Sequence, residues 1–147
     1  MIDIIFSILT GLFGLSMGAT MADIDLAPPL PVRHRSAWTH GPIFPALAWG
    51  IAYLYPGATA FAIGFSVAFA LHLVKDMFPK RWHGGAKISW YPLGGWRMNG
   101  VLSFAFLALS AGISCWLAWQ LAEPELANAY THVSNVIEYA NYRLSLH

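Results

Sequence analysis

Side chains suited to metal and acid–base chemistry gather in this sequence at the ends of hydrophobic segments; they are Asp23, Asp25, Arg33, His34, Arg35, His40, His72 and Asp76. Only 10% of the 147 residues are charged and 57% are hydrophobic, so the chain has few polar groups to place. A charged side chain at the centre of a membrane helix costs roughly 2.5–3.5 kcal/mol. Such groups persist where they are paired, hydrated or functional, and we interpret this set as a candidate metal site.

The strongest local signal is the pair His72 and Asp76, which are four residues apart within a hydrophobic segment. On a helix this spacing places both side chains on one face. Both can then bind one ion, as the paired histidines of an HExxH helix do. The predicted metal ligands are Asp25, His34, His40, His72 and Asp76.

Asp23 is the candidate general base, although either aspartate could instead orient a ligating histidine. The sequence does not divide the roles of ligand and base between Asp23 and Asp25. Arg33 and Arg35 are candidates for binding an anionic substrate group, because arginine makes bidentate contacts to phosphate. Arg35 is therefore assigned to both catalysis and substrate binding.

A ligand set of imidazoles and carboxylates without cysteine is typical of an open catalytic site rather than a closed structural zinc site. Zinc is the first choice, and manganese or iron suit an oxygen-rich set as well. One or two such ions would lower the pKa of bound water and polarise a phosphoryl or acyl oxygen. The chemistry that these residues indicate is therefore hydrolytic.

Four hydrophobic segments must position these residues, over about 4–22, 37–55, 57–77 and 100–122. Their lengths and composition predict an all-α, polytopic membrane helical bundle. Pro56-Gly57 is the expected turn between the second and third spans. The first span lacks a preceding basic segment, so we expect a retained helix rather than a signal peptide. The net charge of +1 gives no indication of a nucleic-acid partner.

The positions of basic residues predict the orientation of the bundle. Seven of the eight lysines and arginines follow the first span or surround the end of the third, namely Arg33, Arg35, Lys75, Lys80, Arg81, Lys87 and Arg97. The positive-inside rule puts that side, with the candidate site, in the cytoplasm and both termini outside. The expected location is a bacterial inner membrane.

Small residues at helical spacing predict close helix packing. Gly14 and Gly18 form a GxxxG pair in the first span, and Ala60, Gly64 and Ala68 form a matching stripe in the third. Small residues let membrane helices approach closely, so these two spans should pack together below the candidate site. Ala108 and Gly112 indicate a further close contact, and Cys115 is expected to be a packing residue.

The C-terminal segment, residues 123–147, is predicted to be a separate amphipathic helix that follows the transmembrane domain of residues 1–122. Glu123-Pro124-Glu125 is a suitable helix start, and apolar residues then recur at helical spacing at Leu126, Tyr130, Val133, Ile137, Ala140 and Leu144. We expect this helix to lie on the outer surface or to dock a protein partner.

The combined motifs resemble those of the YdjM-like family of inner-membrane, metal-dependent hydrolases. They are Asp23-Ile24-Asp25, then His34-Arg35 with Thr39-His40, and then His72-x-x-x-Asp76. Ser36 stands where that family usually has glycine, and one extra residue separates His34-Arg35 from Thr39-His40. The resemblance covers roughly residues 10–95 and implies a membrane-embedded hydrolase.

The predicted function is metal-dependent hydrolysis at the membrane surface, with a lipid phosphoester or another amphiphile as substrate. Two alternatives stay open at this point. The protein could be a non-catalytic subunit of a larger membrane complex, with partners docked on its C-terminal helix and its small-residue helix faces. Alternatively, His40 and His72 could ligate haem or a pigment, although the neighbouring aspartates favour a hard divalent ion.

Overall fold

The structure, a computed structural model, describes residues 2–26, 35–78, 87–89 and 96–145. Within these ranges the chain is all-α, with no strand beyond isolated β-bridges. The elements are α1 (Ile2–Met21), η1 (Ala22–Leu26), α2 (Ile43–Leu54), η2 (Pro56–Ala58), α3 (Thr59–Met77) and α4 (Gly100–Ser145). The prediction of an all-α helical bundle is confirmed.

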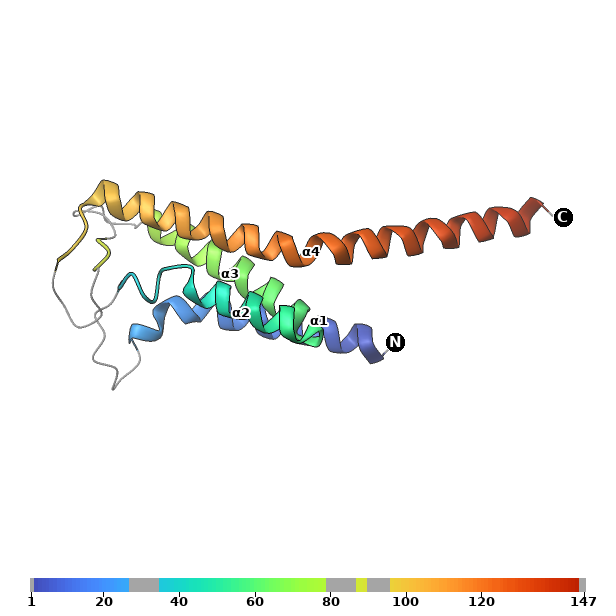
Figure 1. Cartoon of the computed structure of the whole chain (residues 1–147), viewed down its shortest axis with the longest axis horizontal. Helices are drawn as coiled ribbons and strands as arrows, with labels where there is room; N and C mark the ends of the chain where they lie inside the picture. Colours follow the sequence, from blue (N-terminus) through green and yellow to red (C-terminus); the bar gives the residue numbers. More distant parts are fainter. Residues whose placement is uncertain (1, 27–34, 79–86, 90–95, 146–147) are drawn as a thin grey trace.

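The helices run side by side and alternate in direction (Figure 1). The chain leads along α1 to one end, returns through α2, runs forward again in α3 and leaves along α4. We call the end where α1 and α3 finish and α4 begins the loop end. Among the described residues, three segments are long and apolar enough to cross a membrane, namely Ile2–Ile24, Pro56–Met77 and Gly100–Tyr139.

The second predicted span, 37–55, is helical only from Ile43 to Leu54. A helix of 12 residues is about 18 Å long, whereas the hydrocarbon core of a bilayer is about 30 Å thick. Two features delay the start of the helix. Pro42 has no N–H to donate and restricts the backbone conformation of Gly41. The Ser36 hydroxyl accepts the N–H of Thr39, a local hydrogen bond that competes with helix formation. The rest of this crossing, residues 36–42, is irregular backbone.

The contact between α1 and α3 is made by backbone against backbone. A Cβ atom at Gly14 or Gly18 would overlap the carbonyl oxygens of Phe61 and Phe65 respectively, and one at Gly64 would overlap that of Gly11. No larger side chain fits at these points without separation of the helices. The close approach that the GxxxG pair predicted is therefore confirmed.

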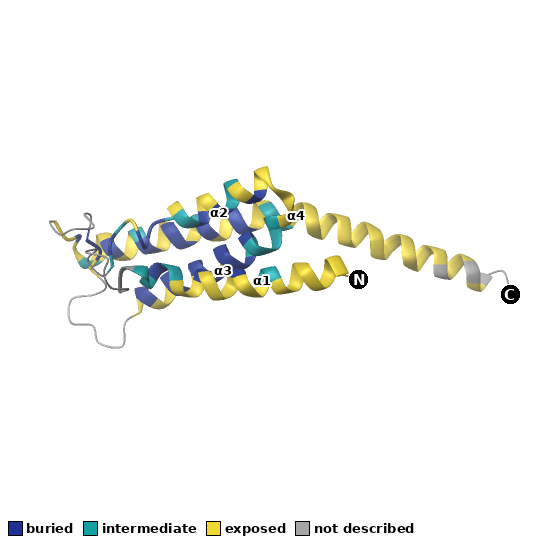
Figure 2. Ribbon diagram, turned by 90° about the horizontal axis from the view of Figure 1, so that it is seen from below, coloured by how far each residue is buried: buried dark blue, intermediate teal, exposed yellow. Residues whose placement is uncertain are grey.

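The surface of α1 has the distribution expected of a helix surrounded by lipid. Its only buried residues are Gly14 and Gly18, while large apolar side chains such as Ile5, Leu9 and Leu12 are more than half exposed. Figure 2 shows this exposed face along most of the helix. In membrane helices small residues typically face the protein and large apolar residues face outward, where lipid solvates them.

The helix α4 continues without interruption through Pro124 to Ser145. Its 46 residues correspond to a length of about 69 Å, more than twice the thickness of the hydrocarbon core. The boundary predicted at residue 123 therefore falls inside one helix. A proline inside a helix bends it by removing one hydrogen bond, and Figure 1 shows α4 changing direction partway along its length.

Two predictions about the packing of α4 are wrong. Ala108 and Gly112 lie on the exposed face, and a Cβ at Gly112 would meet nothing within 4 Å. Cys115 is exposed as well. The face packed against the other helices instead carries Ser103, Leu107, Ser110, Ala111 and Ser114. Two small-residue stripes on one helix cannot be told apart by spacing, since only the neighbouring helices determine which one is covered.

We predict that Gly18→Ala destabilises the bundle by about 1–3 kcal/mol, because the new methyl group must push α1 away from Phe65. The matched control is Gly112→Ala, which adds the same methyl group at an open position and should be neutral or stabilising by up to about 1 kcal/mol. Unfolding of both variants in the same detergent gives the comparison. Equal stability of the two would show that α1 and α3 do not pack through these glycines.

Candidate metal centre

Asp76, in the last turn of α3, is the centre of a polar cluster at the loop end. Its Oδ2 atom lies 3.1 Å from His40 Nε2 and 3.6 Å from His72 Nε2, and its Oδ1 atom lies 3.6 Å from Arg35 Nη2. The side chain of Asp76 is only 11% exposed. A carboxylate at this depth requires partners, and here two imidazoles and a guanidinium surround it.

His72 is held by α1 across the helix interface. Its Nδ1 atom lies 2.8 Å from the carbonyl oxygen of Ala19, and because a carbonyl only accepts, the ring donates from Nδ1. The other nitrogen, Nε2, is buried and has no hydrogen-bond partner among the described residues. It lies 3.6 Å from Asp23 Oδ1 and 3.6 Å from Asp76 Oδ2. Nε2 therefore faces two carboxylates, an arrangement that positive charge stabilises, either as a proton on the ring or as a metal ion between the three groups.

His40 enters the cluster from the irregular segment before α2 and is fully buried. Thr39 Oγ1 lies 2.9 Å from its Nδ1 atom and 3.1 Å from Ser36 Oγ, so two hydroxyl groups fix the orientation of the ring. The Nε2 atom is thereby directed at Asp76 on α3. Orientation of a ligating histidine through its second nitrogen is typical of metal sites.

The segment that carries His40 is held in place by residues far along the chain. Ser89 donates from its backbone N–H to Arg35 O at 2.9 Å and accepts from the N–H of Ala37 at 2.8 Å. Ile88 in turn donates to Ser103 Oγ of α4 at 3.0 Å. Arg35 has a φ of 61°, in the left-handed region that is uncommon for a residue with a Cβ. The bonds to Ser89 on either side of Ser36 keep the backbone in this conformation.

The donor atoms are spaced as the ligands of a single ion would be. With bonds of about 2.0–2.1 Å, the ligand atoms of a tetrahedral zinc ion lie about 3.3–3.4 Å apart. The separations that involve His72 and Asp76 are 3.1–3.6 Å, and the nearest donor atoms of Asp23, His40 and His72 all lie within 4.8 Å of one another. Asp23, His40 and His72 thus form a group that could hold a metal ion.

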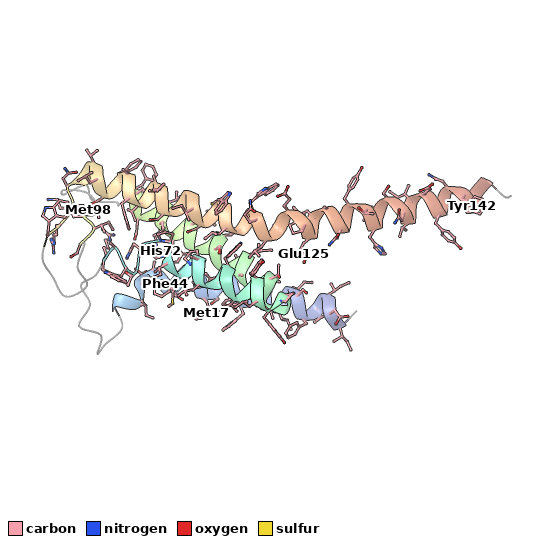
Figure 3. All side chains as sticks on the ribbon, viewed as in Figure 1. Met17, Phe44, His72, Met98, Glu125 and Tyr142 are labelled. Carbon is pink, nitrogen blue, oxygen red and sulfur yellow. The ribbon has the colours of Figure 1, made fainter. Side chains whose placement is uncertain are left out.

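The charges of the cluster also suit a cation. Two carboxylates face one guanidinium, so with neutral imidazoles the cluster carries a formal charge of −1. The carboxylate of Asp23 is 41% exposed, whereas His72 is 7% exposed. The cluster is therefore closed on the side of the bundle and accessible at Asp23. Figure 3 labels His72 within the bundle, toward the loop end where Met98 also lies.

Among the residues predicted from sequence, the structure brings together Asp23, Arg35, His40, His72 and Asp76. Arg33 and His34 lie outside the described residues. Asp25 belongs to η1, but its side chain is not among those described. Among the described side chains Asp23 is the aspartate that lies beside His72, and the assignment of Asp25 as a metal ligand stays a prediction.

Several supporting groups were not identified as such from sequence. Ser36 and Thr39 form a local hydroxyl motif just before a helix, which Ser36-x-x-Thr39 spacing could have indicated. Ser89 and the carbonyl of Ala19 could not have been found this way. Both act through the backbone, and neither lies near His40 or His72 in the sequence.

No protein-family model matches this chain, and no curated protein or solved structure matches it. The chemistry of the site is therefore inferred from the groups that form it, which are two imidazoles and two carboxylates beside one guanidinium.

We predict that, with a chelator present, Asp76→Ala destabilises the protein by about 3–5 kcal/mol, because it leaves the partners of a buried carboxylate uncompensated. Asp23→Ala is the matched control and should cost about 0–1 kcal/mol, since Asp23 is 41% exposed. Chemical denaturation in detergent measures both. Equal losses would contradict the central position of Asp76 in the cluster.

Proposed function

We propose that this protein is a membrane-embedded, metal-dependent hydrolase whose active site lies at the loop end of the bundle. The observation that carries the proposal is the buried Nε2 atom of His72, which has no hydrogen-bond partner in the described part of the chain and faces two carboxylate oxygens 3.6 Å away. Buried polar atoms in proteins are nearly always satisfied. A divalent cation at this point would satisfy His72, His40 and Asp76 together, with Asp23 beside it.

The proposed division of roles follows burial. His40, His72 and Asp76 are buried and would hold the ion, which matches the three protein ligands and open position of catalytic zinc sites. When bound, a divalent ion acidifies water and polarises a phosphoryl or acyl oxygen. Asp23 is the exposed carboxylate of the cluster and is placed to accept the proton of an attacking water. Zinc suits this donor set best, with manganese or iron as alternatives.

The charge and position of Arg35 favour an anionic substrate. Its guanidinium lies 3.6 Å from Asp76 Oδ1 and is partly exposed, so it stands at the edge of the cluster with its charge toward the site. Arginine binds phosphate oxygens with directed pairs of hydrogen bonds. Because the cluster lies at the end of helices that are apolar enough to cross a membrane, a lipid phosphoester or a similar amphiphile is the proposed substrate class.

The proposed setting is the cytoplasmic face of a bacterial inner membrane, in accord with the positive-inside rule. Membership of the YdjM-like family is part of the proposal. It is supported by the three motif elements that hold Asp23, His40 and the His72–Asp76 pair, whose described members converge in space.

A second candidate is a non-catalytic subunit that retains this skeleton. The C-terminal half of α4 favours it, because its described residues after Glu125 are exposed on all sides. Haem bound between His40 and His72 is disfavoured by geometry. Asp76 Oδ2 lies 3.1 Å from His40 Nε2 and 3.6 Å from His72 Nε2, so a carboxylate occupies the place between the two rings that a macrocycle would need.

Metal content tests the site directly. We predict that detergent-purified protein contains close to one equivalent of zinc, manganese or iron by elemental analysis, and that His72→Ala loses it. The control is His132→Ala, which removes an exposed histidine of α4 far from the cluster. Protein that binds none of these ions, even after reconstitution with each, would refute the hydrolase proposal.

Turnover separates the enzyme from the non-catalytic subunit. We predict that metal-loaded protein hydrolyses a phosphodiester presented in short-chain phospholipid micelles. Asp23→Asn should lower the rate by about 10²- to 10⁴-fold through loss of the general base. Arg35→Lys should mainly weaken binding of the substrate, because lysine cannot make the bidentate contact to phosphate. Metal-loaded wild-type protein with no activity on phosphoesters or acyl esters would instead favour the subunit.

A further inference from the structure

Within the part of the chain that the structure describes, no other element covers the apolar side chains of α4 between Leu126 and Leu144. Beyond the point where Glu125 is labelled, the helix extends away from the bundle as far as Tyr142 (Figure 3). Its large apolar residues Leu126, Tyr130, Val133, Ile137 and Leu144 are each 55–78% exposed. A single helix gains most of its stability from packing of an apolar face, so this segment requires a partner.

The spacing of the apolar residues identifies the kind of partner. They recur at intervals of four, three, four, three and four residues, at Leu126, Tyr130, Val133, Ile137, Ala140 and Leu144. This is a heptad repeat, with Tyr130, Ile137 and Leu144 at the a positions and the others at d. The opposite face carries Asn128, Asn135 and Tyr142 at f. A helix that lay on a lipid surface would need only a broad apolar face, whereas a 3.5-residue repeat fits a second helix.

The flanking positions favour a second copy of this chain. The e and g positions carry Ala127, Ala129, Ser134, Val136, Asn141 and Arg143, so only one is charged and identical helices meet without opposing rows of like charge. Two copies in one membrane also share one orientation. Their projecting helices begin at the same height and are parallel and in register before they touch.

We propose that residues 126–144 of two copies form a parallel coiled coil that makes the protein a homodimer. Pro124 precedes the first heptad position, so the bend that it introduces does not interrupt the repeat. The coiled coil leaves the bundle at the end opposite the loop end (Figure 1). Dimerisation therefore leaves the metal cluster of each copy uncovered, and the proposal does not depend on the proposed hydrolase activity.

Disulfide cross-linking of the full chain in lipid vesicles tests the proposal. The native thiol is first removed with Cys115→Ser, which changes an exposed residue. On this background Leu126→Cys should give mainly disulfide-linked dimer, because d positions of a parallel pair approach within the 4.4–6.8 Å that a disulfide spans. Asn128→Cys, half a turn away on the opposite face, should stay monomeric. In an antiparallel pair the two Leu126 positions would be far apart, so Leu126→Cys would then stay monomeric.

A charge substitution provides the second test. Ile137→Asp on the Leu126→Cys background should abolish the cross-linked dimer, whereas Asn135→Asp, which adds the same charge on the f face, should not. Equal cross-linking of Leu126→Cys and Asn128→Cys would indicate random collision and overturn the proposal. Insensitivity to Ile137→Asp would overturn it as well. The metal content of the Ile137→Asp variant should equal that of the wild type, which keeps this test separate from that of the site.

Discussion

The contact of α1 with α3 through glycine is the constraint on which the rest of the molecule depends. Lipid is as apolar as leucine, so membrane helices associate through close packing rather than through burial of large side chains. With Gly18 against Phe65, the end of α1 lies beside the last turns of α3. This placement lets the Ala19 carbonyl accept from His72 and brings Asp23 to the same ring.

The irregular segment before α2 is the second requirement of the site. Non-helical backbone is tolerated at membrane depth only where it is covered by protein, and Ser36, Thr39 and His40 are all buried. Had the second span been helical throughout, its backbone groups would be satisfied internally and no turn would direct His40 at Asp76. The hydrogen bonds to Ser89 replace those that the missing helical turns would have made.

The two ends of the bundle have different chemistry. The loop end combines buried imidazoles and carboxylates with a guanidinium, while the helix that leaves the other end carries an uncharged apolar stripe. Because α4 is one continuous helix, it connects both ends through Ser103 near the site and Leu126 beyond the bundle. Mutations that test the proposed metal site and the proposed dimer can therefore be made independently.

The sequence by itself determined the features that depend on local periodicity: the helices α1 and α3, the glycine faces that join them, and the pairing of His72 with Asp76. It could not determine the start of α2, the continuity of α4 through Pro124, or the packed face of α4. Nor could it show that Asp23 lies beside His72. Those outcomes depend on contacts between residues far apart in the chain, and only the tertiary structure brings such residues together.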